Sequence, residues 1–364
     1  MRLLVEPRLV QSRVVRFGAP AAGLAFGLLL SAIMLELFGI PAPAAYLAII
    51  ESGFTGGLFA ISDTLTVATP LILCGLACAL AFKTRLWNVG AEGQLFLGAW
   101  AATGVAIALL PAGTPGFIAI PCMAVAGFLA GAAWGAVPGF LRARFGTSEI
   151  LTSLMLVYVA AHWNNYFIYS VWSDRGFQMT RLFPRESWLP RLSDLASSWP
   201  GAAGLTLHAG FVVALLLAAL FWFVMFKTRF GFEIKVTGIS ERTAHYAGMP
   251  VRRNIVVVMA LSGGLAGLAG MCEVTGVVHR LQENFSPGYG FTAILVAWLA
   301  RLNPAAIVLV SFLLSGLLVG AREIQPSGIA MMLQGIVLTC VVAADFLTGN
   351  RIRIVKDAAR TEAP

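Results

Sequence analysis

Trp87-Asn-Val-Gly-Ala-Glu-Gly-Gln94 is the most informative stretch of this sequence, and it lies between two apolar segments. It carries two amides, a carboxylate and two glycines in a chain that is otherwise rich in hydrocarbon side chains. Unpaired polar groups in the core of a bilayer are costly, so such a run must face protein or water. The glycines also permit a bend or a close helix crossing. The stretch therefore predicts part of a translocation path or a contact between subunits.

The composition around this stretch is that of a membrane protein. Of the 364 residues, 59% are hydrophobic and only 12% are charged, whereas soluble domains carry about 25% charged residues. Several runs approach the roughly 20 apolar residues that cross a bilayer. Apolar segments are placed at 17–40, 59–82, 93–110, 117–140, 149–170, 208–226, 254–278, 291–301, 304–320 and 328–348. We therefore predict an all-α polytopic membrane protein whose transmembrane domain covers residues 17–348.

The positive charge of the chain reports its topology. Lys and Arg number 25 against 17 acidic residues, a net charge of +8, which by itself would also fit a nucleic-acid partner. The basic residues gather, however, in short segments beside apolar spans, as the positive-inside rule expects of cytoplasmic loops. These segments are 1–16, 83–87, 141–148, 227–253 and 349–364. We predict that both tails are cytoplasmic and that no nucleic acid is bound.

Residues 291–320 complicate the count of crossings. Cytoplasmic tails at both ends require an even number of membrane crossings. Pro304 removes a backbone donor, so a helix break is expected at Arg301-Leu-Asn-Pro304. The region then forms either a re-entrant hairpin or two short crossings, which gives eight to ten transmembrane helices in total. Ten is the number we favour.

The longest loop between apolar segments on the opposite side of the membrane covers residues 171–207. Its four arginines are balanced by three acidic residues, and it carries Trp172, Trp188 and Trp199. Tryptophan is enriched at membrane interfaces. We predict that this external segment lies at the interface or docks a partner.

The loop 227–253 is the one substantial element predicted on the cytoplasmic side. We predict one short helix between Ser240 and Ala247, with Ser240 as its N-cap and Glu241 in its first turn. Four residues are expected to punctuate the loop: Gly231, Gly238, Gly248 and Pro250. A cytosolic motor protein could bind such a helix. The alternative is an ordinary surface loop with an incidental helical turn.

Motifs for catalysis and for nucleotide binding are missing from the sequence. It contains no G-x-x-x-x-G-K-[ST] phosphate loop and no H-E-x-x-H, G-x-S-x-G or C-x-x-C pattern. The four histidines fall in separate segments, and the five cysteines all lie in apolar ones, which indicates small buried thiols. We therefore predict no enzymatic activity and no cofactor in this chain.

Polar residues at membrane depth are the candidates for a substrate path. Glu273 follows a run of small residues, 262–270, in which the glycines at 263, 267 and 270 permit close helix packing. A carboxylate one turn beyond such a face should point into the bundle, either toward a path or as a link between helices. For Glu149 the alternative to a place in the path is a structural role, in which its carboxylate stabilises the positive N-terminal end of a helix. The path candidates are Asn88, Glu92, Gln94, Thr152, Ser153 and Glu273.

Five segments, taken together and in order, resemble the permease subunits of ABC importers in the branched-chain amino acid, ribose and nucleoside superfamily. They are Leu86-Trp-Asn-Val-Gly-Ala-Glu-Gly-Gln-Leu95, Thr147-Ser-Glu-Ile-Leu-Thr-Ser-Leu-Met-Leu156, Ala244-His-Tyr-Ala-Gly-Met249, Ala260-Leu-Ser-Gly-Gly-Leu-Ala-Gly-Leu-Ala-Gly270 and Gly288-Tyr-Gly-Phe-Thr-Ala-Ile-Leu-Val-Ala-Trp-Leu-Ala-Arg-Leu-Asn-Pro304. The likeness covers roughly residues 60–345. It is strongest to the permeases for nucleosides and simple sugars that work with a lipoprotein receptor of the basic-membrane-protein type.

The resemblance implies a bacterial plasma (inner) membrane assembly. Two permeases, commonly different chains, would sit on two ATPase subunits that hold ATP and Mg²⁺, and an external receptor would deliver the substrate. The short cytoplasmic helix would be the coupling element, with contacts from Ser240, Glu241, Ala244, Tyr246, Ala247 and Gly248. The resemblance favours nucleosides as the substrate first, simple sugars second and branched-chain amino acids third.

Two other functional classes compete with this interpretation. An ion-coupled secondary transporter of a small polar solute would use Glu92 or Glu273 as its proton site. A structural or enzymatic membrane protein is disfavoured because no catalytic cluster can be assembled. Uptake driven by a proton gradient through this chain alone would distinguish the secondary transporter from an ATP-driven importer.

Overall fold

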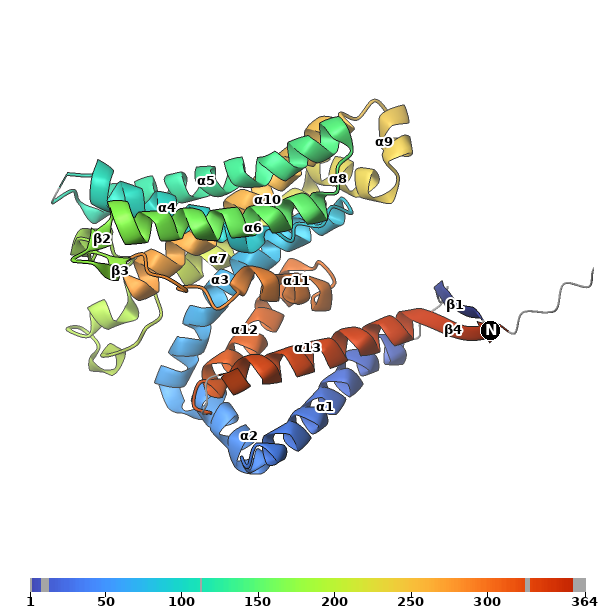
Figure 1. The fold of residues 1–364 in the computed structure, drawn as a ribbon, viewed down its shortest axis with the longest axis horizontal. Helices are drawn as coiled ribbons and strands as arrows, with labels where there is room; N and C mark the ends of the chain where they lie inside the picture. The colour runs from blue at the N-terminus through green and yellow to red at the C-terminus, as the bar shows by residue number, and fades with distance from the viewer. Residues whose placement is uncertain (1, 8–12, 112, 325–327, 356–364) are drawn as a thin grey trace, which may run out of the picture. The chain divides into compact units, whose positions relative to one another are not determined.

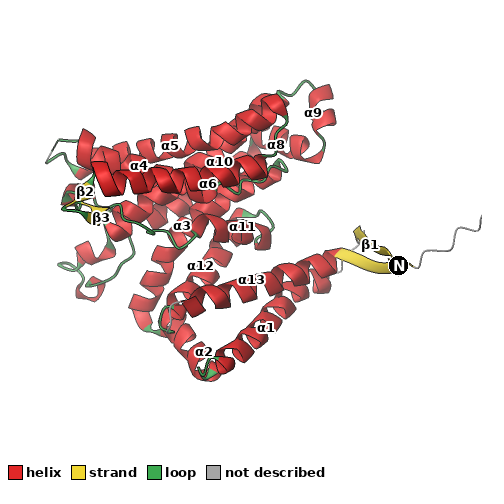
Figure 2. Cartoon of the chain, in the orientation of Figure 1, coloured by secondary structure: helices red, strands yellow, loops and turns green. Residues whose placement is uncertain are grey.

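The computed structural model describes residues 2–7, 13–111, 113–324 and 328–355. Thirteen α-helices make up most of these residues, and the strands found among them are short (Figures 1 and 2). The chain divides into two compact units. One combines Met1–Ser52 with Gly320–Pro364, and the other is Gly53–Val319. The predicted all-α polytopic architecture is confirmed.

The first unit pairs the two ends of the chain. Its elements are β1 (Arg2–Pro7), α1 (Arg13–Leu37), α2 (Ala42–Ile50), α13 (Gly328–Gly349) and β4 (Asn350–Val355). α1 lies along α13 (Figure 1), and a Cβ added to Gly27 would lie only 2.9 Å from the Cα of Val337. β1 pairs antiparallel with β4, so that Arg2 lies opposite Val355. The strands β1 and β4, from the two ends of the chain, therefore lie side by side.

The second unit is a bundle in which α10 packs against α3, α4 and α5. Its helices are α3 (Gly57–Lys83), α4 (Ala91–Gly104), α5 (Gly116–Phe145), α6 (Glu149–Tyr166), α7 (Gly210–Lys227), α8 (Arg229–Ile239), α9 (Glu241–Tyr246), α10 (Val251–Glu273), α11 (Tyr289–Leu299) and most of α12 (Pro304–Ala321). Among the described residues, six helices are long and apolar enough to cross a membrane: α3, α4 with its extension to Leu109, α5, α7, α10 with its extension to Val278, and α12.

The predicted small-residue face of α10 is the closest helix contact of this bundle. A Cβ added to Gly263 would lie 2.2 Å from the carbonyl oxygen of Gly131 in α5, and one on Gly267 would lie 2.2 Å from that of Gly127. On another side, a Cβ on Gly270 would lie 2.0 Å from the carbonyl oxygen of Leu95 in α4. Real Cβ atoms do not approach so closely. The glycines thus let α10 lie backbone to backbone with two neighbours.

The predicted break before Pro304 is confirmed. α11 ends at Leu299, the backbone turns through positive φ at Arg301 (50°) and Leu302 (59°), and α12 begins at Pro304. With 11 residues, α11 is about 16 Å long, roughly half the thickness of a bilayer core. α12, with 18 residues, is long and apolar enough to cross a membrane. Whether 291–320 forms a re-entrant hairpin or two crossings stays a prediction.

Two helices were not predicted, and neither were the short strands. Residues 229–239 form α8, although Gly231 and Gly238 were expected to punctuate a loop there. Both glycines serve close packing instead: a Cβ on Gly238 would lie 2.1 Å from the carbonyl oxygen of Lys83. α2 was also missed, because its nine residues are too few for a membrane span.

The two loops predicted on opposite sides of the membrane lie at opposite ends of the bundle. α9 precedes the first turn of α10, whereas the β2 (Ser173–Asp174) and β3 (Phe177–Thr180) hairpin lies toward the far end of α5 and α10 (Figure 1). The strand β3 also approaches the chain just after α10 through a bridge between Met179 and Gln282. Which end of the bundle faces the cytoplasm stays a prediction.

Candidate functional site

The turn between α3 and α4 carries a closed network of buried amides. The Nδ2 group of Asn88 donates to Gln94 Oε1 and to Ser262 Oγ, each at 2.8 Å, and Gln94 Nε2 donates back to Asn88 Oδ1 at 3.0 Å. Ser262 Oγ in turn donates to the carbonyl oxygen of Ala77 at 2.6 Å. Asn88, Gln94 and Ser262 are at most 1% exposed. The network therefore joins α3, α4 and α10 in the interior of the bundle.

Glu92 links α4 to the half-length helix α11. Its side chain is 3% exposed, and its Oε2 accepts a hydrogen bond of 2.6 Å from the backbone N–H of Gly290. The hydroxyl of Ser286 also hydrogen-bonds to this carboxylate. The N-terminal end of a helix carries unsatisfied N–H groups and a partial positive charge, so a carboxylate is stabilised there. Glu92 thus holds the start of α11 against the start of α4.

Two polar residues of α6 lie beside the same turn. Ser153 is 1% exposed, and a Cβ added to Gly90 would lie 2.9 Å from its Cβ. Thr152 is half-buried, and its hydroxyl donates to the carbonyl oxygen of Ser148 in its own helix at 2.9 Å. Glu149 lies in the first turn of α6, 3.5 Å from Arg142 in an ion pair. The structural role considered for Glu149 at a helix N-terminus fits this position.

Five of the six path candidates therefore gather around one turn, and Glu273 does not. It is the last residue of α10 and is 5% exposed. Eleven residues separate it from Ser262 along the helix, which corresponds to about 16 Å. The carboxylate is thus buried toward the end of the bundle that carries the β2–β3 hairpin. The assignment of these six residues to a substrate path stays a prediction.

An aromatic pair beside the turn was not singled out from the sequence. The rings of Trp87 and Trp298 stack with centroids 5.7 Å apart and an interplanar angle of 25°. Trp87 is 37% exposed and Trp298 is 43% exposed, so the pair presents apolar ring surface outward. The ring centroid of Phe82 lies 4.9 Å from that of Trp87. Both tryptophans lie in family-like motifs, but the 211 positions between them hid their contact.

The short helix predicted between Ser240 and Ala247 is present as α9. The hydroxyl of Ser240 accepts a hydrogen bond of 3.2 Å from the N–H of Thr243, which confirms the predicted N-cap. Gly248, with φ of 73°, lies just beyond the helix in the left-handed conformation that glycine adopts without strain. Ala244 is completely buried and anchors the helix, whereas Tyr246 is 99% exposed. The predicted contact residues other than Ala244 are accessible: Ser240 is half-buried, and Glu241, Tyr246, Ala247 and Gly248 are exposed.

The segment expected outside is attached tightly to the end of α10. The guanidinium of Arg191 donates to the carbonyl oxygens of Gly276 at 2.7 and 2.9 Å and of Val277 at 3.0 Å. The indole of Trp188 stacks on the ring of His279, with centroids 3.6 Å apart. These contacts hold the segment in one place, whereas Trp199 remains 49% exposed.

His208 lies buried under this segment in its neutral form. It is 3% exposed, and its Nδ1 accepts a hydrogen bond of 3.1 Å from the N–H of Gly210. Burial, followed by the nearby charges of Arg191 and His279, lowers the pKa of His208 to about 4. Nε2 has no hydrogen-bond partner among the described residues. A proton on this ring would therefore be unfavourable at neutral pH.

Comparison with known proteins places these features in a family. The family described as "Branched-chain amino acid transport system / permease component" matches residues 60–342. The chain is similar to the guanosine ABC transporter permease protein of Bacillus subtilis (strain 168), with 34% identity over 89% of this chain and 91% of that protein. It is also similar to the glucose ABC transporter permease protein of Haloferax volcanii, with 32% identity over 100% and 97% of the two chains. A nucleoside ABC transporter permease protein of Lactococcus lactis is 30% identical over 89% and 88%.

Proposed function

The chain belongs to the family of branched-chain amino acid transport system permease components, and we propose that it is the permease subunit of an ATP-driven importer of nucleosides or simple sugars. The match over residues 60–342, which covers nearly all of the bundle, is the observation that carries this proposal. A subunit of this kind moves its substrate without chemical change. ATP and Mg²⁺ belong to a separate ATPase chain, in agreement with the absence of a phosphate loop from this sequence.

The ATPase is proposed to act through α9. Ala244 fixes the helix to the bundle, while the fully exposed ring of Tyr246 offers an aromatic anchor of the kind that dominates protein interfaces. Since α9 leads directly into α10 through Pro250, a push on α9 reaches the helix against which α3, α4 and α5 pack. Closure of the ATPase would thus shift the bundle between outward-open and inward-open states.

The orientation proposed is that of a bacterial inner-membrane protein with both tails in the cytoplasm. Pairing of β1 with β4 supports an arrangement with both ends of the chain on the same side of the membrane. The basic segments beside the spans favour the cytoplasm for that side and for α9. The segment 171–207, at the other end of the bundle, faces outward.

Nucleosides are the proposed first substrate class and simple sugars the second. Two of these three relatives carry a nucleoside in their names, and one carries glucose. The exposed faces of Trp87 and Trp298 suit a nucleobase, because stacking of a base on an aromatic ring contributes about 1–3 kcal/mol. A sugar lacks the flat π-face that this pair would recognise.

The polar residues around the turn are proposed to border the substrate path. Asn88 and Gln94 bond to each other in this conformation, so they would meet substrate only when α4 and α10 separate. Glu92 holds α11, which by its length ends inside the membrane. The turn, together with Thr152, Ser153 and the more distant Glu273, is therefore proposed to line the route that opens during transport.

The proposed partners outside the ATPase are a receptor and a second permease. The segment 171–207 presents exposed apolar side chains at Phe177 (61%), Leu182 (55%) and Trp199 (49%) on a frame held by Arg191. Such a rigid, partly apolar surface suits docking of an external substrate-binding lipoprotein. The second permease is proposed to be a different but related chain.

The first experiment is a pull-down of the tagged, detergent-solubilised protein from its own membranes. Wild type should co-purify with a P-loop ATPase. Tyr246→Arg should lose that ATPase without unfolding, because the side chain is exposed. Phe177→Arg changes another exposed aromatic, at the other end of the bundle, and should retain it. A chain that purifies alone and takes up solute under a proton gradient would establish a secondary transporter instead.

A further inference from the structure

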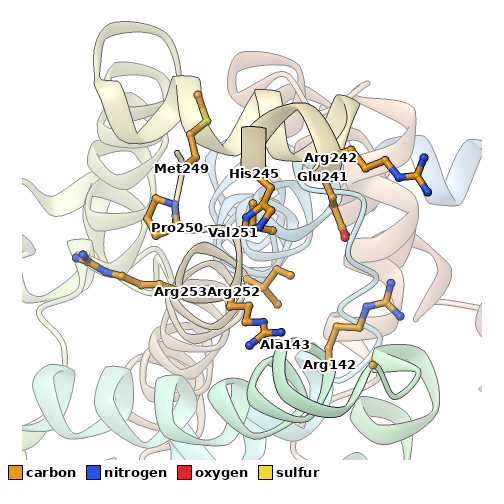
Figure 3. A pocket seen from close by; sticks show the side chains of 12 residues that line it. Arg142, Ala143, Glu241, Arg242, His245, Met249, Pro250, Val251, Arg252 and Arg253 are labelled. Carbon is orange, nitrogen blue, oxygen red and sulfur yellow. The ribbon is translucent and has the colours of Figure 1, made fainter. Parts of the chain in front are cut away.

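A cavity lies between α9 and the adjoining ends of α5 and α10. It has a volume of about 910 Å³ and is lined by the last turn of α5, by α9 and by the first turn of α10. Figure 3 shows His245 and Glu241 directed into it from α9, with Arg142 and Arg252 approaching from the bundle side. The cavity therefore separates the proposed coupling helix from the helices that it would move.

The lining of this cavity is strongly basic. It contains Arg142, Arg242, Arg252 and Arg253 but only one carboxylate, that of Glu241. With Glu149, which pairs with Arg142, the residues at the cavity carry four guanidinium groups and two carboxylates, an excess of two positive charges, although Figure 3 shows Arg242 and Arg253 directed away from its centre. Among the described residues, the arginines at 242, 252 and 253 lie in no ion pair. This charge is left for a ligand from outside the chain.

An apolar groove continues from the same arginines. It measures about 240 Å³ and is lined by Phe140, Ala143, Arg144, Arg252, Arg253 and Val256. Phe140 is 53% exposed. The groove runs along the ends of α5 and α10, two of the helices long and apolar enough to cross a membrane. A soluble phosphate would use the basic cavity alone, whereas a lipid would use both surfaces.

We propose that the cavity and the groove together bind one anionic phospholipid. The phosphodiester would lie between Arg252 and Arg142, and an acyl chain would follow Phe140 and Val256. Basic pockets at the cytoplasmic ends of membrane helices are suited to anionic headgroups. The proposal rests on the orientation proposed above, which puts this end of the bundle at the cytoplasmic leaflet. The bound lipid would tie α9 to α5 and α10 and so set the stiffness of the coupling element.

The test is a lipid titration of the purified full-length chain followed by native mass spectrometry. Dioleoyl-phosphatidylglycerol should bind more tightly than dioleoyl-phosphatidylcholine. Arg252→Gln together with Arg253→Gln should weaken binding of the anionic lipid roughly 25-fold, since each arginine near an anionic headgroup contributes about fivefold. The matched control is Arg85→Gln with Arg229→Gln, which removes two exposed charges from the same end of the bundle but from neither lining.

Two further arms separate a lipid from a free phosphate. Glycerol 3-phosphate should not displace the dioleoyl lipid, and dihexanoyl-phosphatidylglycerol should bind more weakly than the dioleoyl form. Phe140→Ala should reduce that preference for long chains. Equal binding of both headgroups, equal losses in the two double variants, or full displacement by glycerol 3-phosphate would each overturn the proposal. None of these readouts requires the ATPase or the substrate, so they stand apart from the pull-down.

Discussion

Replacing Asn88 with Ala should destabilise the bundle more than any other single polar truncation at the turn. The side chain makes four hydrogen bonds, to Gln94 twice, to Ser262 and to the N–H of Gly90. Interhelical hydrogen bonds in membrane proteins contribute about 0.6 kcal/mol each, with an upper value of about 1.7. Buried groups left unpaired add to the loss. The expected cost is about 3 kcal/mol of unfolding free energy.

Thermal unfolding in detergent can be followed with a thiol-reactive dye. Cys74, Cys78 and Cys272 are buried in the folded chain and become reactive only when it opens. At about 2 °C per kcal/mol for a chain of this size, Asn88→Ala should lower Tm by about 6 °C. Thr152→Ala is the matched control. It removes a hydroxyl that bonds only within its own helix and should shift Tm by less than about 1 °C.

A double-mutant cycle with Gln94→Ala completes this test. Because the two amides exchange two hydrogen bonds, their coupling energy should reach about 1–2 kcal/mol. Additive effects of the two substitutions would show that the network does not exist in the folded protein. A Tm for Asn88→Ala equal to that of Thr152→Ala would refute the reasoning from buried polar groups.

Three other outcomes are expected. Gly131→Ala should lower Tm, because its Cβ would lie 2.3 Å from a carbonyl oxygen of α10, and the free energy of unfolding should fall by about 1–3 kcal/mol. Gly335→Ala has open space at its Cβ and should leave Tm unchanged. For His208 the folded pKa of about 4 lies below the unfolded value of about 6.5, so the unfolded chain binds the proton more readily between these values. The contribution of neutral His208 to the free energy of unfolding should therefore be fully present above pH 6.5 and fall by up to about 3 kcal/mol toward pH 4. Thermal melts across this range should show a smaller pH dependence for His208→Phe than for wild type. In reconstituted importer, Trp298→Ala should reduce guanosine uptake about tenfold, and Trp298→Phe should reduce it much less. Equal uptake by the two variants would show that the aromatic pair does not contact the substrate.

Local signals predicted most of the helices. Each of the apolar segments placed from the sequence corresponds to a helix whose ends lie within a few residues. Pro304 predicted the break before α12, and Ser240 predicted the start of α9. These features depend on neighbours in the chain, since a missing N–H or a capping hydroxyl acts within one helical turn. α8 was not predicted because its two glycines resemble loop residues until the helices that they pack against, α7 and α3, are known.

The sequence by itself determined the class of protein, the positions of the spans and the small-residue face of α10. The length of an apolar segment, the basic residues beside it and the spacing of its glycines are local properties that determine how it spans and packs in a bilayer. Only the tertiary structure decided where the polar groups go. Asn88 and Ser262 are 174 positions apart, and Glu92 and Gly290 are 198 positions apart, yet each pair is hydrogen-bonded. No local pattern specifies such partners, because a buried amide or carboxylate is satisfied by whichever group the packing of distant helices brings within about 3 Å.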